Sequence, residues 1–143
     1  MDGTPDFKLI MEAKELINIA LKARKYSHTP YSNFKVGAAL LGSSGKVYTG
    51  SNVESSSYGL TICAERVALV KALSEGETDF QSLAVVSVPG ASLCGACRQL
   101  LWEYTKDIPV YTSDLNMNFV ERKLSALLPY PFDNSQLVSD NEK

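Results

Sequence analysis

The amino-acid sequence predicts an α/β fold, a three-layer α/β/α sandwich built on a mixed five-stranded sheet. Two strand-like runs flank a Gly/Ser-rich turn and so predict a β-hairpin. Helix-like and strand-like segments then alternate along the rest of the chain. Because hairpin strands pair antiparallel and strand–helix–strand units pair parallel, the sheet should be mixed, with helices on both faces.

The first half of the chain predicts one helix and the hairpin. Residues 6–26 are expected to be an amphipathic helix, because apolar side chains recur there at helical spacing. These apolar residues are Leu9, Ala13, Leu16, Ile17 and Ala20. A loop is expected over residues 28–33, and strands over residues 35–41 and 46–52, joined by a turn at residues 42–45.

The second half predicts helices and strands in alternation. Residues 63–75 are helix-forming, and Gly76 supplies a stop. Residues 83–88 are almost wholly apolar, as expected of a strand that is buried on both faces. The remaining expected elements are a turn over 89–92, a helix over 95–104, a strand over 109–112, and a last strand and helix over 119–127.

Length and composition are those of one ordinary globular domain. The chain has 143 residues, of which 45% are hydrophobic and 21% charged, so we expect one domain over residues 1–143, with about residues 1–6 and 136–143 frayed. No apolar run approaches the roughly 18 residues of a membrane span, and no export signal opens the chain. A cytoplasmic protein with reduced thiols is therefore expected. The net charge of −2 argues against nucleic acid as a partner.

The three cysteines stand in two short motifs, C-A-E at Cys63 and C-x-x-C at Cys94 and Cys97. Three thiolates can bind Zn²⁺ and leave its fourth position open to water, which distinguishes a catalytic zinc site from a closed structural one. Glu65 is well placed to move protons on and off that water. The cysteines fall at two predicted helix starts, where the positive helix ends suit thiolates. Arg66 can hydrogen-bond a ligand sulfur and offset the negative charge.

Two alternatives remain open at this point. Cys94 and Cys97 can form a redox dithiol, since such motifs also occur at helix starts, with Cys63 as a buried small side chain. The cysteines can instead form a structural zinc knot without catalysis. A third cysteine at another predicted helix start, accompanied by Glu65, favours a metal site over the redox pair.

These motifs resemble the two zinc signatures of the cytidine deaminases, in the small, homotetrameric three-cysteine class of the cytidine/deoxycytidylate deaminase superfamily. The resemblance covers about residues 10–135, in the family's order. The matching segments are T-I-C-A-E-R at 61–66, C-G-A-C-R-Q at 94–99, P-Y-S-N-F-K-V-G-A-A at 30–39, N-V-E at 52–54, and L-L-P at 127–129 with Phe132.

The resemblance implies a reaction, the hydrolytic deamination of cytidine and 2′-deoxycytidine to the uridine products and ammonia, as in pyrimidine salvage. One Zn²⁺ per chain would be held by Cys63, Cys94 and Cys97, and zinc-bound hydroxide would attack C4 of the pyrimidine with Glu65 as proton shuttle. The family's small class forms homotetramers with shared active sites. Phe132 would reach the site of a neighbouring subunit.

Substrate contacts also follow from the resemblance. Asn52 and Glu54 would hydrogen-bond the ribose, Glu54 at its 3′-hydroxyl, while the Ala64 backbone reads the base edge and Phe34 packs beside the base. A Glu54 carboxylate that is buried and left unpaired without the sugar would make the site reject bare cytosine by about 10⁴–10⁵-fold. A deaminase of the same fold that acts on a cytosine-containing antibiotic such as blasticidin S is the nearest alternative, and the ribose contacts argue against it.

The chain departs from the family at three positions. The family usually has proline where this chain has Leu93, so the turn before the third helix is expected to be looser. Ser51 and Ser55 also replace residues that are common in the family. The single histidine, His28, lies in a turn and is not expected to be catalytic.

Overall fold

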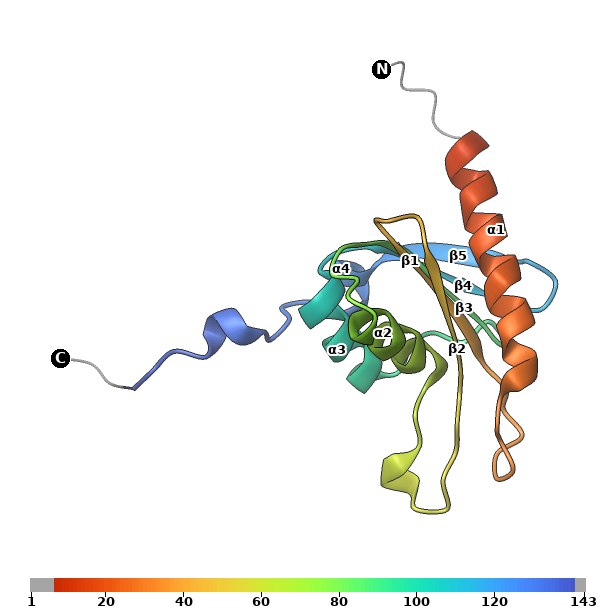
Figure 1. The fold of residues 1–143 in the computed structure, drawn as a ribbon, viewed down its shortest axis with the longest axis horizontal. Helices are drawn as coiled ribbons and strands as arrows, with labels where there is room; N and C mark the ends of the chain where they lie inside the picture. The colour runs from red at the N-terminus through yellow and green to blue at the C-terminus, as the bar shows by residue number, and fades with distance from the viewer. Residues whose placement is uncertain (1–6, 141–143) are drawn as a thin grey trace.

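Five strands form one mixed sheet, in the order β2-β1-β3-β4-β5, within residues 7–140, which are the residues that the computed structural model describes (Figure 1). β3 and β4 run parallel, and every other neighbouring pair in this sheet is antiparallel. The predicted mixed five-stranded sheet is therefore confirmed. The strands are β1 Gly37–Gly42, β2 Val47–Ser51, β3 Phe80–Val86, β4 Pro109–Ser113 and β5 Phe119–Lys123.

Helices cover both faces of the sheet, as the alternation of elements predicts (Figure 1). The helix α1 Phe7–Ala23 lies across one face, and α2 Ala64–Ser74 and α3 Gly95–Thr105 lie on the other. None of the helices in the described part of the chain combines the length and apolarity that crossing a membrane requires. The shorter elements are η1 Arg24–Tyr26, η2 Tyr58–Leu60, α4 Leu124–Leu127 and η3 Asn134–Gln136.

The ends that were expected to be frayed are only partly described. Residues 1–6 and 141–143 lie outside the described residues. Residues 136–140 are described, and beyond the last residue of η3 they form neither helix nor strand. Their side chains are exposed.

β3 organises the core, because its side chains are buried on both faces of the sheet, as expected for a central strand. Leu83 and Val85 pack in the cluster beneath α2 and α3. Ala84 and Val86 pack in the cluster beneath α1. The strand begins at Phe80, earlier than the sequence indicates, because it continues to pair with the end of β1.

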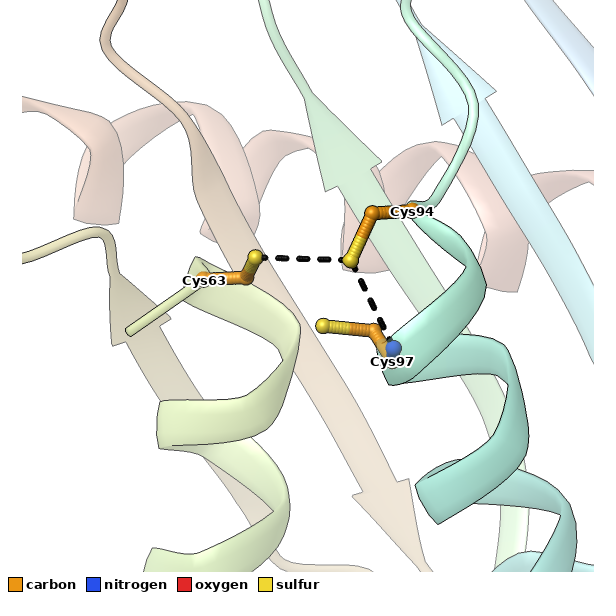
Figure 2. Close-up of side chains that lie close together, drawn as sticks. All are labelled: Cys63, Cys94 and Cys97. Atoms are coloured by element: carbon orange, nitrogen blue, oxygen red, sulfur yellow. Dashed lines mark hydrogen bonds between the residues drawn. The ribbon is translucent and has the colours of Figure 1, made fainter. Parts of the chain in front are cut away.

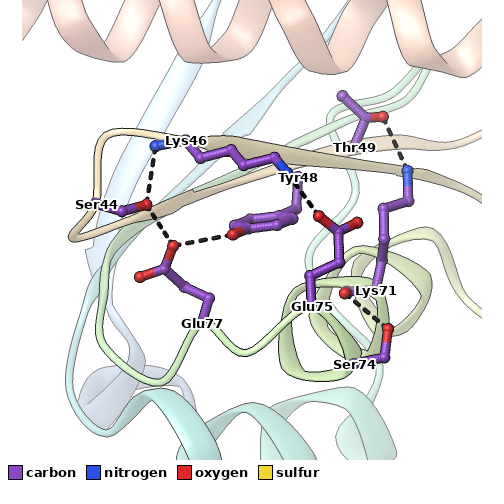
Figure 3. A network of polar contacts seen from close by, with 8 residues as sticks. All are labelled: Ser44, Lys46, Tyr48, Thr49, Lys71, Ser74, Glu75 and Glu77. Atoms are coloured by element: carbon purple, nitrogen blue, oxygen red, sulfur yellow. Dashed lines mark hydrogen bonds and ion pairs between the residues drawn. The ribbon is translucent and has the colours of Figure 1, made fainter.

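A polar network ties the β1–β2 hairpin to the C-terminal end of α2 (Figure 3). Glu77 Oε1 accepts hydrogen bonds from Ser44 Oγ at 2.5 Å and from Tyr48 OH at 3.0 Å. Lys46 Nζ lies 2.6 Å from Glu75 Oε1. Because most of these groups are exposed, each contact contributes little to stability. Together they fix where the end of α2 lies against the hairpin.

The other end of α2 lies against β2 with no room for a side chain between them. A Cβ atom added at Gly50 would lie 2.2 Å from the Ala64 carbonyl oxygen and 2.7 Å from Ala68 N. Glycine therefore allows the first turn of α2 to rest directly on the strand. This contact sets the position of the helix start that follows Cys63.

We expect Gly50→Ala to lower the free energy of unfolding by at least about 1–3 kcal/mol, because the added methyl group overpacks a backbone contact that cannot yield locally. Urea unfolding followed by circular dichroism measures this change. Gly59→Ala is the matched control, since no atom lies within 4 Å of its added Cβ. Equal stability of the two variants would contradict the close approach.

Candidate active site

Three cysteine sulfurs converge where α2 and α3 begin (Figure 2). Cys63 is the N-cap of α2, Cys94 is the N-cap of α3, and Cys97 lies in the first turn of α3. Their Sγ atoms all lie within 4.8 Å of one another. The Cys97 backbone N–H donates to Cys94 Sγ at 3.5 Å. Two positive helix ends therefore face the sulfurs, as the sequence predicts.

The sulfur positions suit a tetrahedral metal ion. Sulfurs bound to one tetrahedral zinc at about 2.3 Å stand about 3.8 Å apart, and Cys63 Sγ and Cys94 Sγ are separated by 3.7 Å. All three cysteines are free thiols, so no disulfide joins Cys94 to Cys97. Because Cys63 joins the other two thiols, the arrangement does not fit a redox pair with a bystander cysteine. The donor set fits zinc.

Hydrogen bonds among the thiols set their protonation. A hydrogen bond from the Cys97 thiol lowers the pKa of Cys63 to about 6, and a second one from Cys94 and the charge of Arg66 act in the same direction. The same hydrogen bond to Cys63 raises the pKa of Cys97. The metal-free cluster therefore holds a thiolate at Cys63 that the neighbouring thiols stabilise.

Glu65 lies beside the cysteines with only 4% of its surface exposed. Burial raises the pKa of this carboxyl group to about 7. A group with such a pKa can both accept and donate a proton near neutral pH, which is the requirement for general acid–base catalysis. Its position at the second residue after Cys63, in the first turn of α2, brings it to the sulfurs.

Arg66 faces the sulfurs, as the sequence predicts. Its Nη2 lies 3.9 Å from Cys97 Sγ. Its Nε is buried and has no hydrogen-bond partner. The guanidinium group therefore brings a positive charge to a cluster whose thiolates would carry three negative charges when a metal is bound.

A pocket of about 160 Å³ brings most of the sequence-predicted site residues together. The predicted residues that line it are Phe34, Asn52, Cys63, Ala64, Glu65 and Cys94. Glu54 lines a neighbouring, wider pocket of about 410 Å³, and Thr61 lines both. Phe132 lines neither pocket, and it lies half-exposed on the segment that extends away from the sheet (Figure 1).

Asn52 already has partners within the chain. Its Oδ1 accepts from Val36 N at 3.0 Å, and its Nδ2 donates to the Phe34 carbonyl at 2.8 Å. Asn52 is buried, so these bonds hold the loop that carries Phe34 against the pocket. One N–H and one acceptor position of the amide remain available to a ligand.

Glu54 differs from the sequence-based expectation of a buried carboxylate that is unpaired without a sugar. The carboxylate accepts from Tyr31 N at 3.0 Å, from Ser32 N at 3.1 Å and from Ser32 Oγ. The residue is half-buried. The hydrogen bond from the Ser32 hydroxyl is the main cause that lowers the pKa of Glu54. The expectation was wrong because sequence spacing does not show that the loop 22 residues earlier supplies these donors.

The β3–α3 connection contributes pocket residues that the sequence analysis did not identify. Ser87, Ala91 and Ser92 line the pocket beside Cys94. Ser87 is buried, and its Oγ accepts from Ala91 N at 2.9 Å, which holds the turn. The run of small residues between a buried strand and the C-x-x-C motif was the available signal.

His28 lies outside the pocket and its side chain is exposed. Its backbone is structural: the N–H donates to the Asn52 carbonyl and the carbonyl accepts from Glu54 N, each at 2.9 Å. These bonds place the loop of His28 alongside the strand-end residues 52–54.

Comparisons with known proteins agree with this geometry. A family model of the cytidine and deoxycytidylate deaminase zinc-binding region matches residues 11–112. A cytidine deaminase from Sporosarcina psychrophila is 43% identical over 130 residues, which cover 89% of this chain and 96% of that protein. The crystal structure of cytidine deaminase from Burkholderia pseudomallei, 43% identical, superposes with a TM-score of 0.80 and covers 82% of this chain and 97% of that one. A blasticidin-S deaminase from Bacillus cereus is 27% identical over 137 residues, or 89% of this chain and 91% of that protein.

We expect Cys63 of the metal-free protein to react with iodoacetamide with a pH midpoint near 6. An ordinary thiol, with a pKa of about 8.5, is mostly protonated at that pH. Peptide mass spectrometry after timed alkylation at each pH gives the profile of Cys63. Cys97→Ala removes the main hydrogen bond and should move the midpoint upwards. A midpoint of about 8.5 in the native chain would contradict the thiol network.

Proposed function

The chain belongs to the cytidine and deoxycytidylate deaminase family, and from this premise we propose that it catalyses the zinc-dependent hydrolytic deamination of cytidine and 2′-deoxycytidine. The products are uridine, 2′-deoxyuridine and ammonia. One observation carries the proposal: three thiols converge beside a pocket that two of them line together with a buried carboxyl group with a pKa of about 7.

Cys63, Cys94 and Cys97 would hold one Zn²⁺ per chain. Zinc supplies Lewis acidity when bound and lowers the pKa of a water molecule to about 7. Arg66 would offset part of the negative charge of the three thiolates, because its guanidinium group already lies against Cys97.

Glu65 would move the protons of the reaction. Its carboxyl group lies in the pocket wall next to the sulfurs, and its pKa of about 7 leaves both protonation states accessible near neutral pH. We infer that it accepts a proton from the water and delivers it to N3 of the pyrimidine, then accepts a second proton from the resulting C4 hydroxyl and delivers it to the departing amine as the C4 carbonyl forms. One carboxyl group can serve all these transfers because they follow one another at adjacent atoms.

The two neighbouring pockets suit the two halves of a nucleoside. The smaller one, beside Glu65, would take the base, with Phe34 at its face and the Ala64 backbone at its edge. The wider one, across Thr61, would take the ribose. The protein donors occupy both acceptor positions of Glu54 Oε1 and one of Oε2, so Oε2 can accept from a 3′-hydroxyl without losing them.

We further infer a homotetramer in which Phe132 completes the site of a neighbouring subunit. Phe132 is 52% exposed and lines neither pocket of its own chain. The segment around it points away from the sheet (Figure 1). It carries further exposed apolar residues. These residues are Tyr130, Leu137 and Val138. A reducing compartment such as the cytoplasm suits this site, because its three thiols must stay reduced to bind metal.

The nearest alternative is a deaminase of a cytosine-containing antibiotic such as blasticidin S. The relative with that name is less similar, at 27% identity against 43% for the cytidine deaminase from Sporosarcina psychrophila. Asn52 and Glu54 each keep hydrogen-bonding positions that their protein partners do not use. These positions favour a substrate with a free ribose. A structural zinc knot would give no reason for a buried carboxyl group beside the sulfurs.

The reaction can be tested by measuring zinc content and ammonia release on cytidine, 2′-deoxycytidine, cytosine and blasticidin S. We expect about one zinc per chain and turnover of both nucleosides. Because Glu54 keeps its protein partners without a sugar, the loss of one hydrogen bond to a charged group should slow cytosine by about 10–10²-fold, less than an unpaired carboxylate would cause. Metal-free protein with a disulfide, or turnover of blasticidin S alone, would contradict the proposal.

Glu65→Gln should retain zinc and fold but lose at least about 10²–10⁴-fold in kcat, because glutamine has a similar shape and cannot carry protons. The loss should lie at the upper end of this range, since one group serves several transfers. Steady-state kinetics with a parallel zinc assay measures this. An active Glu65→Gln enzyme with a full complement of zinc would assign the proton transfers to another group.

Shared active sites can be tested by complementation between two inactive variants. Phe132→Ala and Glu65→Gln should each have low activity alone, because every site lacks one component. After mixing under conditions that exchange subunits, some sites receive an intact Glu65 and an intact Phe132 from different chains, and activity should return. Absence of recovery despite proven exchange would place Phe132 outside the neighbouring site.

A further inference from the structure

Arg98 connects two segments that are distant in the sequence. This half-buried side chain uses three different donor nitrogens. Its Nε donates to the Leu93 carbonyl at 2.8 Å, and its Nη2 donates to Ser92 Oγ at 3.1 Å. Its Nη1 donates to the Leu127 carbonyl at 2.7 Å. The first two contacts lie in the turn before α3, and the third lies at the end of α4.

The first pair of contacts fixes the turn that presents the second proposed zinc ligand. The Leu93 carbonyl belongs to the same rigid peptide unit as the Cys94 N–H, so the Arg98 bond orients the peptide that leads into Cys94. The Leu93 side chain is buried, with 3% of its surface exposed. Ser92 lines the pocket. In the absence of a proline ring at position 93, this hydrogen bond limits rotation of that peptide.

The third contact fixes the root of the C-terminal arm, by which we mean residues 128–140. Leu127 is the last residue of α4, directly before the arm. Two further side chains of α3 hold the next part of the arm. Gln99 Nε2 donates to the Phe132 carbonyl at 2.6 Å, and Trp102 Nε1 donates to Asp133 Oδ2 at 3.3 Å. The helix that carries Cys97 therefore also holds the segment that carries Phe132.

We propose that Arg98 is a positioning residue that couples the turn before Cys94 to the root of the C-terminal arm. Arg98 does not itself line the pocket, and its guanidinium group reaches the pocket wall only through Ser92. It acts because its planar fork of donors holds two backbone carbonyls at a fixed separation. A lysine ammonium group concentrates its donors at one point and lacks this fork. The part of the proposal that concerns the C-terminal arm rests on the proposed role of Phe132. The part that concerns the turn before Cys94 does not.

Hydrogen–deuterium exchange of the full-length protein, with and without zinc, tests the coupling directly. Two amides report on the two segments: Ala91 N, bonded to Ser87 Oγ, and Leu128 N, bonded to the Leu124 carbonyl. Arg98→Met should accelerate exchange at both amides by about 10–10²-fold, the equivalent of one lost hydrogen bond from a charged donor at each segment. Zinc release to a chelator should accelerate in the same variant.

Two matched controls separate the coupling from general loosening. Gln99→Leu removes an arm contact only, so it should accelerate exchange in the arm and leave Ala91 unchanged. Arg122→Met removes an exposed cation on β5 and should change neither amide. Arg98→Lys keeps the charge and should loosen at least one of the two segments.

A variant Arg98→Met that changes one segment or neither overturns the proposal. If that variant does not fold, Arg98→Lys decides the matter, and native exchange at both reporter amides in Arg98→Lys overturns it. These readouts require no substrate. If Arg98→Met accelerates exchange at both reporter amides but the native protein releases no ammonia from cytidine, the coupling stands and the proposed function is refuted. In an active protein, Arg98→Met should raise KM for cytidine, while Arg122→Met leaves KM unchanged.

Discussion

The site depends on two helices that begin at the same place. α2 and α3 begin 31 residues apart in the sequence, yet their starts present three sulfurs within 4.8 Å of one another. Unbonded N–H groups and the positive ends of two helix dipoles make this one of the few places in a small domain where several thiolates can gather. α2 lies against β1 and β2, and both helices share one hydrophobic cluster with Leu83 and Val85 of β3. At Gly50 the backbone of α2 meets β2 directly, so the Cys63 end of the site has little freedom to shift.

The residues assigned to the substrate are also structural residues. Asn52 and Glu54 bind the backbone of residues 31–36, and that loop carries Phe34 into the pocket wall. A single set of side chains therefore holds the pocket open and keeps hydrogen-bonding capacity for a ligand. Because these hydrogen bonds hold the loop before any ligand arrives, ligand binding does not lose free energy in ordering it. This arrangement explains why Glu54 is not left unpaired in the free protein.

Much of the fold could be predicted from local patterns. Periodicity located α1, helix-forming residues followed by Gly76 located α2, and the Gly/Ser turn located the hairpin, because these signals depend on neighbours within a few residues. The cysteine motifs likewise predicted the sulfur cluster, with Glu65 and Arg66 beside it. Contacts between segments were beyond such reasoning. The donors to Glu54 lie 22 and 23 residues away, and the bond from Arg98 to Leu127 spans 29. Nothing in the spacing of either residue indicates these partners, because apart from the Ser32 hydroxyl they are backbone groups that every residue carries.

The contact between Trp102 and Asp133 has a practical consequence. The chain contains one tryptophan, and its indole N–H bonds a side chain of the C-terminal arm. Indole emission responds to hydrogen bonding and to water around the ring, so the intrinsic fluorescence of this protein is an optical record of one event, the seating of the arm on α3. The molecule thus carries its own spectroscopic label at the junction between the metal-bearing helix and the segment that extends from it, and no dye or engineered probe is needed to follow that junction in solution.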